Sequence, residues 1–384
     1  MENFKMVAKT LYGFEDVLAQ ELKNLGAIDV QKGVRNVSFY GDKGFMYKAN
    51  LSLRTAIKIL KPIQSFKIFS EDDLYKKMYN IRWEEYLHNK GSLAIDATVH
   101  SQKFTHSKFI ALKTKDAIVD KFRNTTGFRP SIDLQYPDLR INVHIEDMFC
   151  TVSLDSSAQS LHKRGYKAST NIAPINEVLA AGMLLMSGWD GRSDFLDPMC
   201  GSGTILVEAA MIACNIPPNI NKKEFGFEKW KDWDVDLFEK IEASALNKIR
   251  GFDHKIIGYD KAPSAVRKAQ ENIENANLTE FISVEQQDFF KTEKVTEGHL
   301  HMLFNPPYGE RLELLNLELF YSQIGDTLKQ NYPNTQAWFI VSNLEAIKNV
   351  GLRPSRKIKL YNGKLESRLL KYDIYEGSKK ASKN

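Results

Sequence analysis

The alternation of short apolar strands with helices after about residue 175 constrains the fold of this chain more than any other feature. Such alternation is typical of a mostly parallel sheet with helices on both faces. Asn362-Gly363 separates two further strands, and this dipeptide is a strong hairpin signal, so we expect the sheet to end in an antiparallel pair. The expected strands are 195–197, 255–259, 282–286, 300–304, 337–341, 356–361 and 365–375, and the expected helices are 175–188, 204–213, 264–276 and 319–330.

The first 155 residues have a different pattern, in which strands and helices follow one another without regular alternation. We expect an α+β region here and not a doubly wound sheet. Between these parts of the chain, residues 216–252 are rich in Trp and charge and are expected to form a mainly helical insertion. Residues 376–384 are expected to be a disordered polar tail. The expected front-half helices are 13–25, 42–49, 71–80 and 108–123, and the strands are 5–10, 29–31, 36–40, 56–66, 93–99, 140–146 and 148–154.

The composition excludes some classes of protein. No apolar run reaches the ~18 residues of a membrane span, and the N-terminus lacks the basic start and apolar stretch of a secretion signal. The cysteines, Cys150, Cys200 and Cys214, form no CxxC pair, so neither a zinc site nor a disulfide framework is predicted. We therefore expect a cytoplasmic protein with no membrane contact and no metal.

The segment FLDPMCGSGTILVEAAMIA, residues 195–213, runs from an apolar strand through Asp197 into a turn with Gly201 and Gly203, and then into a helix. Glycines permit a tight turn and the close approach of a ligand, and ligands bind at the carboxyl ends of such strands. The loop lacks the lysine of a P-loop, and residue 206 is Leu where a dinucleotide motif has Gly. Because Asp197 would repel a pyrophosphate, it suits a cationic ligand end, such as the amino group of a methionyl moiety.

Two more acidic residues follow predicted strands. Asp260 ends the second strand, where an acidic residue typically binds ribose hydroxyls. Asp288-Phe289 follows the third strand, where a carboxylate can accept from an adenine amino group beside an aromatic ring. This order of residues predicts a site for S-adenosyl-L-methionine, with S-adenosyl-L-homocysteine (SAH) as product. The residues expected at the cofactor site are Asp197, Pro198, Cys200, Gly201, Ser202, Gly203, Thr204, Asp260, Lys261, Asp288, Phe289 and Asn305.

A proline-rich loop, HMLFNPPYGERL at residues 301–312, follows the strand expected at 300–304. The prolines cannot continue the hydrogen bonding of the strand, and the residue before a proline is biased away from helix. We expect the loop to hold the Asn305 amide and the Pro306 carbonyl in fixed directions beside the cofactor. Asn305, Pro306, Pro307 and Tyr308 are therefore predicted as catalytic residues.

The chemistry of an exocyclic amine explains why such a loop is needed. The amine on a base is a poor nucleophile because its lone pair is delocalised into the ring. Two oxygen acceptors on its hydrogens favour a pyramidal nitrogen whose lone pair points at the methyl sulfonium, and positioning supplies much of the acceleration. Tyr308 is expected to stack on a base that has left its own stack. Guanine N2, adenine N6 and cytosine N4 share this chemistry, so the motif does not identify the base.

With DPMCGSGT at 197–204 and NPPYGERL at 305–312, the chain resembles the class I (Rossmann-like) amino-methyltransferases. More closely, it is similar to the bacterial THUMP-containing 23S rRNA guanine-N2 methyltransferases, which are often labelled putative N6-adenine-specific DNA methylases. The resemblance covers nearly the whole chain. It implies a ferredoxin-like region at 1–60, a THUMP RNA-binding domain at 61–155, a linker at 156–174 and a methyltransferase domain at 175–375.

The resemblance also implies a reaction and a partner. The reaction is methyl transfer from S-adenosyl-L-methionine to the exocyclic N2 amine of a guanosine, and the partner is 23S rRNA or a large-subunit assembly intermediate. The family's cofactor residues carry over to Asp197, Gly201, Gly203, Asp260 and Asp288, and its amine-binding motif carries over to 305–308. The best-known member is fused to a second methyltransferase domain, so we expect this chain to carry out one methylation and not two.

The distribution of positive charge also favours a polyanionic partner. Residues 101–130 hold seven Lys or Arg against two acids, and residues 351–371 hold seven against one, while the net charge of the whole chain is +5. The first run interleaves its cations with aromatic residues, which suits phosphates and unpaired bases. The residues expected to contact RNA are Lys103, Lys108, Arg129, Arg164 and Tyr166.

Two alternatives remain open at this point. The first is the same chemistry on another target, either N2 of a tRNA guanosine or N6 of adenine in RNA or DNA. A THUMP-like front half favours RNA, and the sequence predicts no helix for reading a DNA major groove. The second is a non-catalytic RNA-binding or ribosome-assembly factor, against which the intact acidic, glycine and NPPY residues argue.

Overall fold

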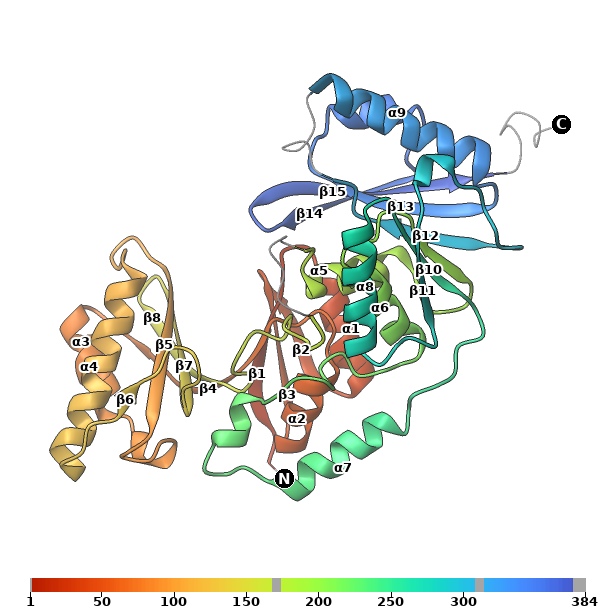
Figure 1. Cartoon of the computed structure of the whole chain (residues 1–384). Helices are drawn as coiled ribbons and strands as arrows, with labels where there is room; N and C mark the ends of the chain where they lie inside the picture. Colours follow the sequence, from red (N-terminus) through yellow and green to blue (C-terminus); the bar gives the residue numbers. More distant parts are fainter. Residues whose placement is uncertain (1, 168–173, 308–313, 376–384) are drawn as a thin grey trace. The chain divides into compact units, whose positions relative to one another are not determined.

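The computed structural model describes residues 2–167, 174–307 and 314–375, apart from the side chains of 314–316 and 346. The chain divides into two compact units (Figure 1). No helix in the described parts of the chain is long and apolar enough to cross a membrane. Unit 1 comprises Met1–Thr10, Leu18–Leu161 and Lys222–Ser244, and unit 2 comprises Leu11–Val17, His162–Asn221 and Ala245–Asn384.

Unit 1 is built on a mixed sheet with the strand order β2-β3-β1-β4-β8-β7-β5-β6. The expected α+β region is confirmed, and the short strand β6 is an element that the sequence did not predict. The strands are β1 (Phe4–Lys9), β2 (Ile28–Gly33), β3 (Asn36–Gly41), β4 (Lys58–Lys67), β5 (Ser92–His100), β6 (Ser131–Ile132), β7 (Leu139–Glu146) and β8 (Phe149–Asp155). The helices are α1 (Glu15–Leu25), which begins in unit 2, α2 (Lys43–Ser52), α3 (Glu71–Asn80), α4 (Ser107–Thr126) and α7 (Val235–Leu246), which runs past the end of unit 1.

Strand β4 connects the two parts of this sheet. Its first residues pair with β1, with Lys58 opposite Lys9, and its remaining residues pair with β8, with Lys67 opposite Phe149. The boundary expected after residue 60 therefore falls inside a strand. The reason is that one long extended segment contributes hydrogen bonds to both neighbours, which local sequence patterns do not reveal.

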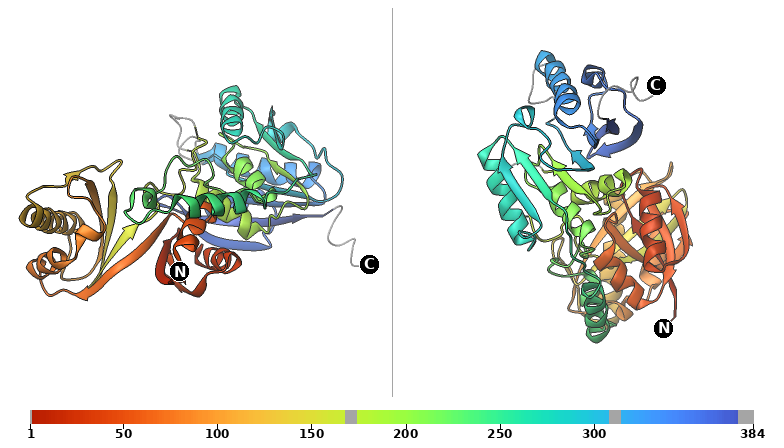
Figure 2. Two further views of the ribbon diagram at one scale, coloured as in Figure 1. Left: turned by 90° about the horizontal axis from the view of Figure 1, so that it is seen from below. Right: turned by 90° about the vertical axis from the view of Figure 1, so that its right-hand side faces the viewer.

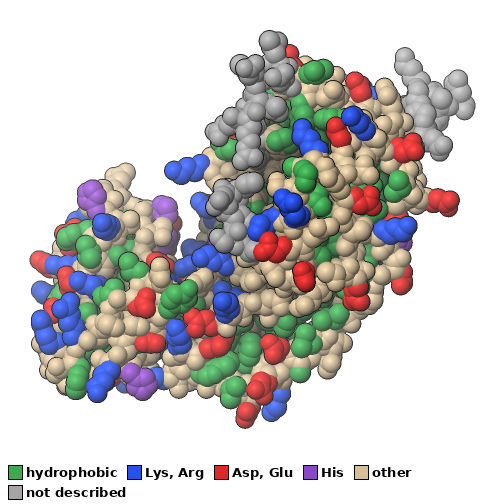
Figure 3. All heavy atoms as spheres, viewed as in Figure 1, with side chains coloured by type: hydrophobic (Ala, Val, Ile, Leu, Met, Phe, Trp, Pro, Cys, Tyr) green, Lys and Arg blue, Asp and Glu red, His purple; other side chains and the backbone are tan. Residues whose placement is uncertain are grey.

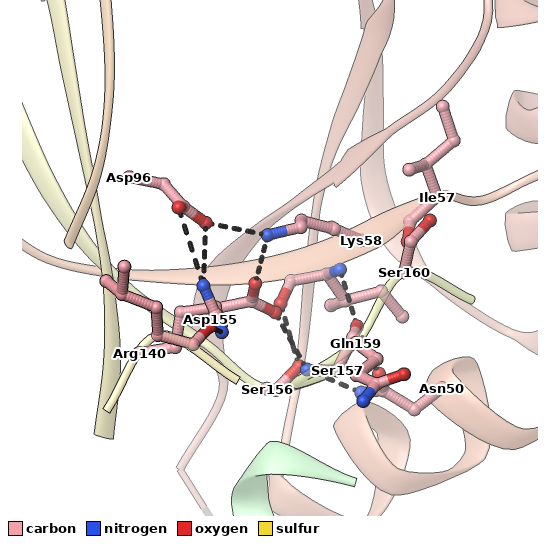
Figure 4. Close-up of polar contacts among 12 residues, drawn as sticks. Asn50, Ile57, Lys58, Asp96, Arg140, Asp155, Ser156, Ser157, Gln159 and Ser160 are labelled. Atoms are coloured by element: carbon pink, nitrogen blue, oxygen red, sulfur yellow. Dashed lines mark hydrogen bonds and ion pairs between the residues drawn. The ribbon is translucent and has the colours of Figure 1, made fainter. Parts of the chain in front are cut away.

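A polar cluster lies beside this strand (Figure 4). Lys58 Nζ lies 2.8 Å from Asp155 and 3.0 Å from Asp96, and Arg140 also contacts Asp96 at 3.4 Å. Asp155 is 1% exposed. Burial raises the pKa of its carboxyl, and the neighbouring Lys58 ammonium opposes that shift. Lys58 is thus the main ionic partner of a buried carboxylate, and removing it leaves that charge with poor compensation.

Helices α3 and α4 lie side by side (Figure 2). Ser70 is the N-cap of helix α3, because the backbone N–H of Asp73 donates to Ser70 Oγ at 3.1 Å. Helix α4 ends at Gly127, which has a φ of +74°. The apolar residues buried on α4 are Ile110, Ala117, Ile118, Val119 and Phe122, which recur at helical spacing.

The expected insertion at 216–252 is helical in part. It contains a 3-10 turn at Gly226–Lys229 and helix α7, and its segment 222–244 belongs to unit 1. There, Trp233 and Phe227 pack edge-on or tilted against Tyr47 of α2, with ring centroids 5.2 and 4.4 Å away. The aromatic residues of this segment therefore form a core with α2.

Unit 2 contains a sheet with the strand order β11-β10-β9-β12-β13-β15-β14. The first five of these pair in parallel and β15 pairs antiparallel with both β13 and β14, which confirms the expected sheet with a terminal hairpin. The strands are β9 (Asp194–Asp197), β10 (Ile256–Asp260), β11 (Ile282–Gln286), β12 (Leu300–Phe304), β13 (Thr335–Val341), β14 (Arg356–Asn362) and β15 (Leu365–Ile374).

Helices cover both faces of this sheet (Figure 1). Helix α9 (Leu314–Asn331) buries Tyr321, Ile324 and Leu328 in one core with Met302 and Phe304 of β12. On the opposite face, Ser187 at the end of α5 contacts His301, the residue of β12 that points the other way, at 2.8 Å. Helices α5 (Glu177–Ser187), α6 (Thr204–Ala213) and α8 (Pro263–Asn275) occupy that second face.

Candidate active site

The acidic residues of the predicted cofactor site lie at one edge of the sheet of unit 2. Strand β9 lies between β10 and β12, with Asp197 opposite Gly258 and Leu196 opposite Met302. All three strands are parallel, so their carboxyl ends meet at this edge, and adjacent strands are about 4.8 Å apart. Asp197, Asp260 and Asn305 stand at or directly after these ends. The register therefore brings together three of the residues that the sequence predicts.

The glycine loop between β9 and α6 turns back on the end of β10. The backbone N–H of Cys200 donates to the Tyr259 carbonyl at 2.8 Å, and that of Gly203 donates to the Cys200 carbonyl at 2.8 Å. Gly201 and Gly203 have φ values of +54° and +76°, the left-handed region that favours glycine. Pro198, Cys200 and Thr204 are buried, while Ser202 is partly exposed. The loop is therefore a tight turn that ends at the N-terminus of α6.

Asp260 holds this loop in place. Its Oδ2 accepts from the backbone N–H of Gly201 at 3.0 Å, and its Oδ1 accepts from that of Ala262 at 2.9 Å. The same carboxylate thus connects the glycine turn to the start of α8. A carboxylate offers about four lone-pair sites, so Asp260 keeps acceptor capacity for a ligand hydroxyl. Lys261, which follows it, is exposed.

Asp197 is a buried carboxylate without an ionic partner among the residues that the structure describes. It is 1% exposed, and its Oδ1 accepts one hydrogen bond, from the Met199 backbone N–H at 3.1 Å. Burial raises the pKa of Asp197 well above its usual range, and the Asp260 carboxylate raises it further. A buried charge of this kind is costly unless it is paired. The site therefore fits a ligand that brings a cationic group.

The third acidic position differs in part from the expectation. Asp288 Oδ1 accepts from the Phe290 backbone N–H at 3.2 Å, at the start of the 3-10 turn Phe289–Lys291. The ring of Phe289 is 2% exposed and packs against Phe304 and Tyr332, with centroids 5.9 and 5.6 Å away. The prediction that this ring lies beside an adenine is wrong, because the 3-10 turn directs it into the core. The partly exposed ring of Phe290 lies next to it.

The proline-rich loop leaves the sheet next to Asp197. Asn305 is partly buried, Pro306 is buried and Pro307 is exposed. The first half of the loop therefore starts at the end of β12, one strand from β9, as the sequence predicts. Tyr308, the fourth predicted catalytic residue, lies outside the described residues.

Sequence analysis missed one residue that supports the cofactor loop. Asn272 of α8 is fully buried, and its Nδ2 donates to the Ser202 carbonyl at 2.9 Å. The available signal was a polar side chain on a helix face that otherwise carries Val266, Ala269 and Ile273. An Asn on such a face needs hydrogen-bond partners, and here one is the glycine turn.

The expectation that Arg164 and Tyr166 contact RNA is wrong. Both are 1% exposed, and Arg164 Nε lies 3.2 Å from Glu208 Oε1 of α6. Arg164 also donates to Asn219 Oδ1 at 3.2 Å. The physical reason is that Glu208 lies on an apolar, fully buried helix, where an acid requires a cationic partner. These residues pack the predicted linker against α6.

The remaining RNA candidates, Lys103, Lys108 and Arg129, are exposed. Lys108 lies in the first turn of α4, Lys103 precedes this helix and Arg129 follows its end, and a helix of 20 residues is about 30 Å long. They therefore form two separate groups. Figure 3 shows Lys and Arg side chains over the part of unit 1 that carries α3 and α4, mixed with acidic side chains. Among the described residues, no group of three or more His, Cys, Asp or Glu is arranged to hold a metal ion.

Comparison with protein-family models gives three matches along the chain. Residues 5–60 match the RlmL ferredoxin-like domain, residues 69–155 match the THUMP domain, and residues 164–371 match the RMKL-like methyltransferase domain. The third match covers more than half of the chain and contains all of the predicted cofactor and catalytic residues.

Known proteins resemble the chain over nearly all of its length. It is 38% identical to the ribosomal RNA large subunit methyltransferase K/L of Syntrophotalea carbinolica over 97% of this chain, and it spans 54% of that relative. The chain thus spans about half the length of the first curated relatives it matches. It is 37% identical to a putative RNA methyltransferase of Synechocystis, with 94% of this chain and 95% of that protein covered.

A solved structure also resembles the chain over nearly all of its length. A putative methyltransferase complexed with SAH superposes with a TM-score of 0.88 at 28% identity, covering 98% of this chain and all of that one. Its extent matches the ferredoxin-like, THUMP and methyltransferase regions together. The chain belongs to the RMKL-like methyltransferase family, with an RlmL ferredoxin-like domain and a THUMP domain before its methyltransferase domain.

Proposed function

We propose that this protein transfers a methyl group from S-adenosyl-L-methionine to the exocyclic N2 amine of a guanosine in 23S rRNA. One observation carries the proposal. The buried Asp197 carboxylate, without an ionic partner in the described structure, stands at the end of β9, and the Asn305 loop leaves the neighbouring strand β12. A site for a cationic ligand thus lies next to a loop with two oxygen acceptors.

The described residues fit the cofactor in three places. Asp197 would hold the cationic amino group of the methionyl end, Asp260 would accept from the ribose hydroxyls, and Asp288 would accept from the adenine amino group. The glycine turn, held by Asp260 and Asn272, lets the backbone approach the ligand closely. When bound, the cofactor supplies an electrophilic methyl group on a sulfonium.

The chain's own task is then to orient the amine. Asn305 Oδ1 and the Pro306 carbonyl would accept its two hydrogens and so direct the nitrogen lone pair toward the methyl group. The buried Pro306 fixes the direction of the loop at the end of β12. Because the methyl donor is already activated, the residues act by positioning and no strong base is needed.

The choice of substrate rests on the relatives and on the front half of the chain. The K/L relatives are named as large-subunit ribosomal RNA methyltransferases, and the THUMP match favours an RNA partner. In this proposal the chain is divided into a ferredoxin-like region at 1–60, a THUMP domain at 61–155, a linker at 156–174 and a methyltransferase domain at 175–375. Lys103, Lys108 and Arg129 would contact the RNA, and the enzyme would act in the cytoplasm.

The test is methylation of unmodified rRNA and tRNA transcripts by the purified protein, followed by mass spectrometry of the nucleosides. We expect N2-methylguanosine in 23S rRNA. N2-methylguanosine in tRNA alone, or N6-methyladenosine, would replace the proposed target. Calorimetry that detects no binding of S-adenosyl-L-methionine would support a non-catalytic RNA-binding factor instead.

A further inference from the structure

A basic hollow of about 540 Å³ lies in unit 2, outside the cofactor site. Its size falls in the ~300–1,000 Å³ range of ligand sites. Four cations line it, and no acidic residue does: Lys348, Arg353, Lys357 and Arg368. The rest of the lining is mainly apolar and includes Leu352 and Leu370. Cations over an apolar floor match the two parts of a nucleotide, a phosphate and a sugar with its base.

The charges of this hollow are only partly compensated. Arg368 NH1 lies 2.9 Å from Glu366, and Lys348 pairs with Glu345. Arg353 and Lys357 are exposed and form no ion pair with any residue that the structure describes. Two of the four cations are therefore available to an anionic ligand. Arg353, Lys357 and Arg368 belong to the excess of positive charge at 351–371, to which the proposed reaction assigns no role.

The hollow lies toward the edge of the sheet that carries the active site. Strands β12 and β13 are parallel, with Phe304 opposite Phe339, so both leave the sheet at that edge. Arg368 of β15 pairs with Val341, the last residue of β13. Strand β15 is two strands from β12, a separation of about 10 Å at about 4.8 Å per strand. A strand of RNA whose target base reaches Asn305 can therefore extend its neighbouring phosphates to this hollow.

We infer that this hollow binds a backbone phosphate of the RNA beside the target nucleotide, through Arg353, Lys357 and Arg368. The inference rests on the proposed RNA substrate and adds a contact made by the methyltransferase domain itself. An RNA strand is favoured over a small free anion because the two uncompensated cations are exposed and the floor is apolar. Both features suit a polymer that passes across the surface.

The test is the salt dependence of binding to an unmodified 23S rRNA transcript, measured by filter binding. The double variant Arg353→Gln/Lys357→Gln should reduce the magnitude of the slope of log K against log[salt] by about 0.7–0.9, the value for one lost phosphate contact. The matched control is Arg356→Gln/Lys364→Gln, which removes the same charge from exposed positions outside the lining. The control should change the slope by less than half as much, and both variants should bind S-adenosyl-L-methionine like the parent.

Equal slopes for the two double variants, or no change in the first, would overturn the inference. A second experiment measures the binding of inorganic phosphate to the protein by calorimetry. Saturable phosphate binding that the first double variant abolishes, with its RNA slope unchanged, would assign the hollow to a free anion and contradict the inference. The result is also separable from the proposed function, because the slope reports on RNA contact whether or not a methyl group is transferred.

Discussion

Replacement of Arg164 by Ala should destabilise unit 2 and leave RNA contacts largely intact. Both Arg164 and its partner Glu208 have side chains that are 0% exposed, so Arg164→Ala leaves a carboxylate buried without its cation. Breaking a buried pair in this way costs about 3–5 kcal/mol. For a unit of about 200 residues, 1 kcal/mol shifts Tm by about 2–4 °C, so the unfolding transition of unit 2 should fall by roughly 6–20 °C.

Differential scanning calorimetry of the whole chain measures this shift. The double variant Arg164→Met/Glu208→Leu should recover most of the loss, because an apolar pair of similar volume replaces both charges. Lys103→Ala is the contrasting variant, since it alters an exposed side chain that we propose as an RNA contact. It should weaken RNA binding with a Tm change of about 1 °C or less. A small Tm change for Arg164→Ala together with a large loss of RNA affinity would refute the reasoning.

Three further substitutions test other parts of the account. Asp197→Asn should weaken S-adenosyl-L-methionine binding about 10–150-fold, the equivalent of a charge-assisted hydrogen bond of about 1.5–3 kcal/mol, and unchanged calorimetric affinity would remove Asp197 from the site. The same variant should raise the Tm of the ligand-free protein at neutral pH, because burial raises the pKa of Asp197 and the ionised carboxylate therefore destabilises the folded state as pH rises. This gain in Tm should vanish below the unfolded-state pKa of about 3.9. A gain that grows in acid would contradict the prediction. Lys58→Met should lower the free energy of unfolding by about 2–4 kcal/mol, which is less than the effect of Arg164→Ala because the Lys58 side chain is 23% exposed. A urea midpoint equal to the parent's would show that Asp155 does not depend on this ammonium. Gly325→Ala would place a Cβ 1.7 Å from the Val350 carbonyl oxygen, so α9 must shift at a cost of about 1–3 kcal/mol or more, and a parent-like Tm would contradict that packing.

Much of unit 2 was predictable from local sequence. The strands 282–286 and 300–304 and the helix 204–213 have the bounds that the sequence predicts. The strand 300–304 and the helix 204–213 are short apolar runs, and polar residues follow all three elements within two positions, so their limits are set within a few residues of chain. The position of Asp197 and Asn305 at neighbouring strand ends follows from parallel pairing, which the alternation of elements already implies.

The errors concern side chains whose environment is set by distant residues. Arg164 appears as an exposed linker cation in sequence, but its partner Glu208 is 44 residues away and the two are buried together. Phe289 and Phe290 are adjacent, and only the 3-10 turn decides that the first ring enters the core. The support that Asn272 gives to the glycine turn also depends on how α8 packs. Sequence periodicity identifies faces, but it does not identify which polar groups meet across them.

Asn305→Ala tests the central claim most directly, because it removes one proposed amine acceptor and leaves the acidic residues of the cofactor site unchanged. The measurement pairs calorimetric binding of S-adenosyl-L-methionine with single-turnover methyl transfer to unmodified 23S rRNA. We predict a cofactor Kd close to the parent's and a transfer rate lower by at least about 100–1,000-fold, the cost of losing one group that positions a transition state. A variant that transfers the methyl group as fast as the parent would contradict the proposed role of the Asn305 loop.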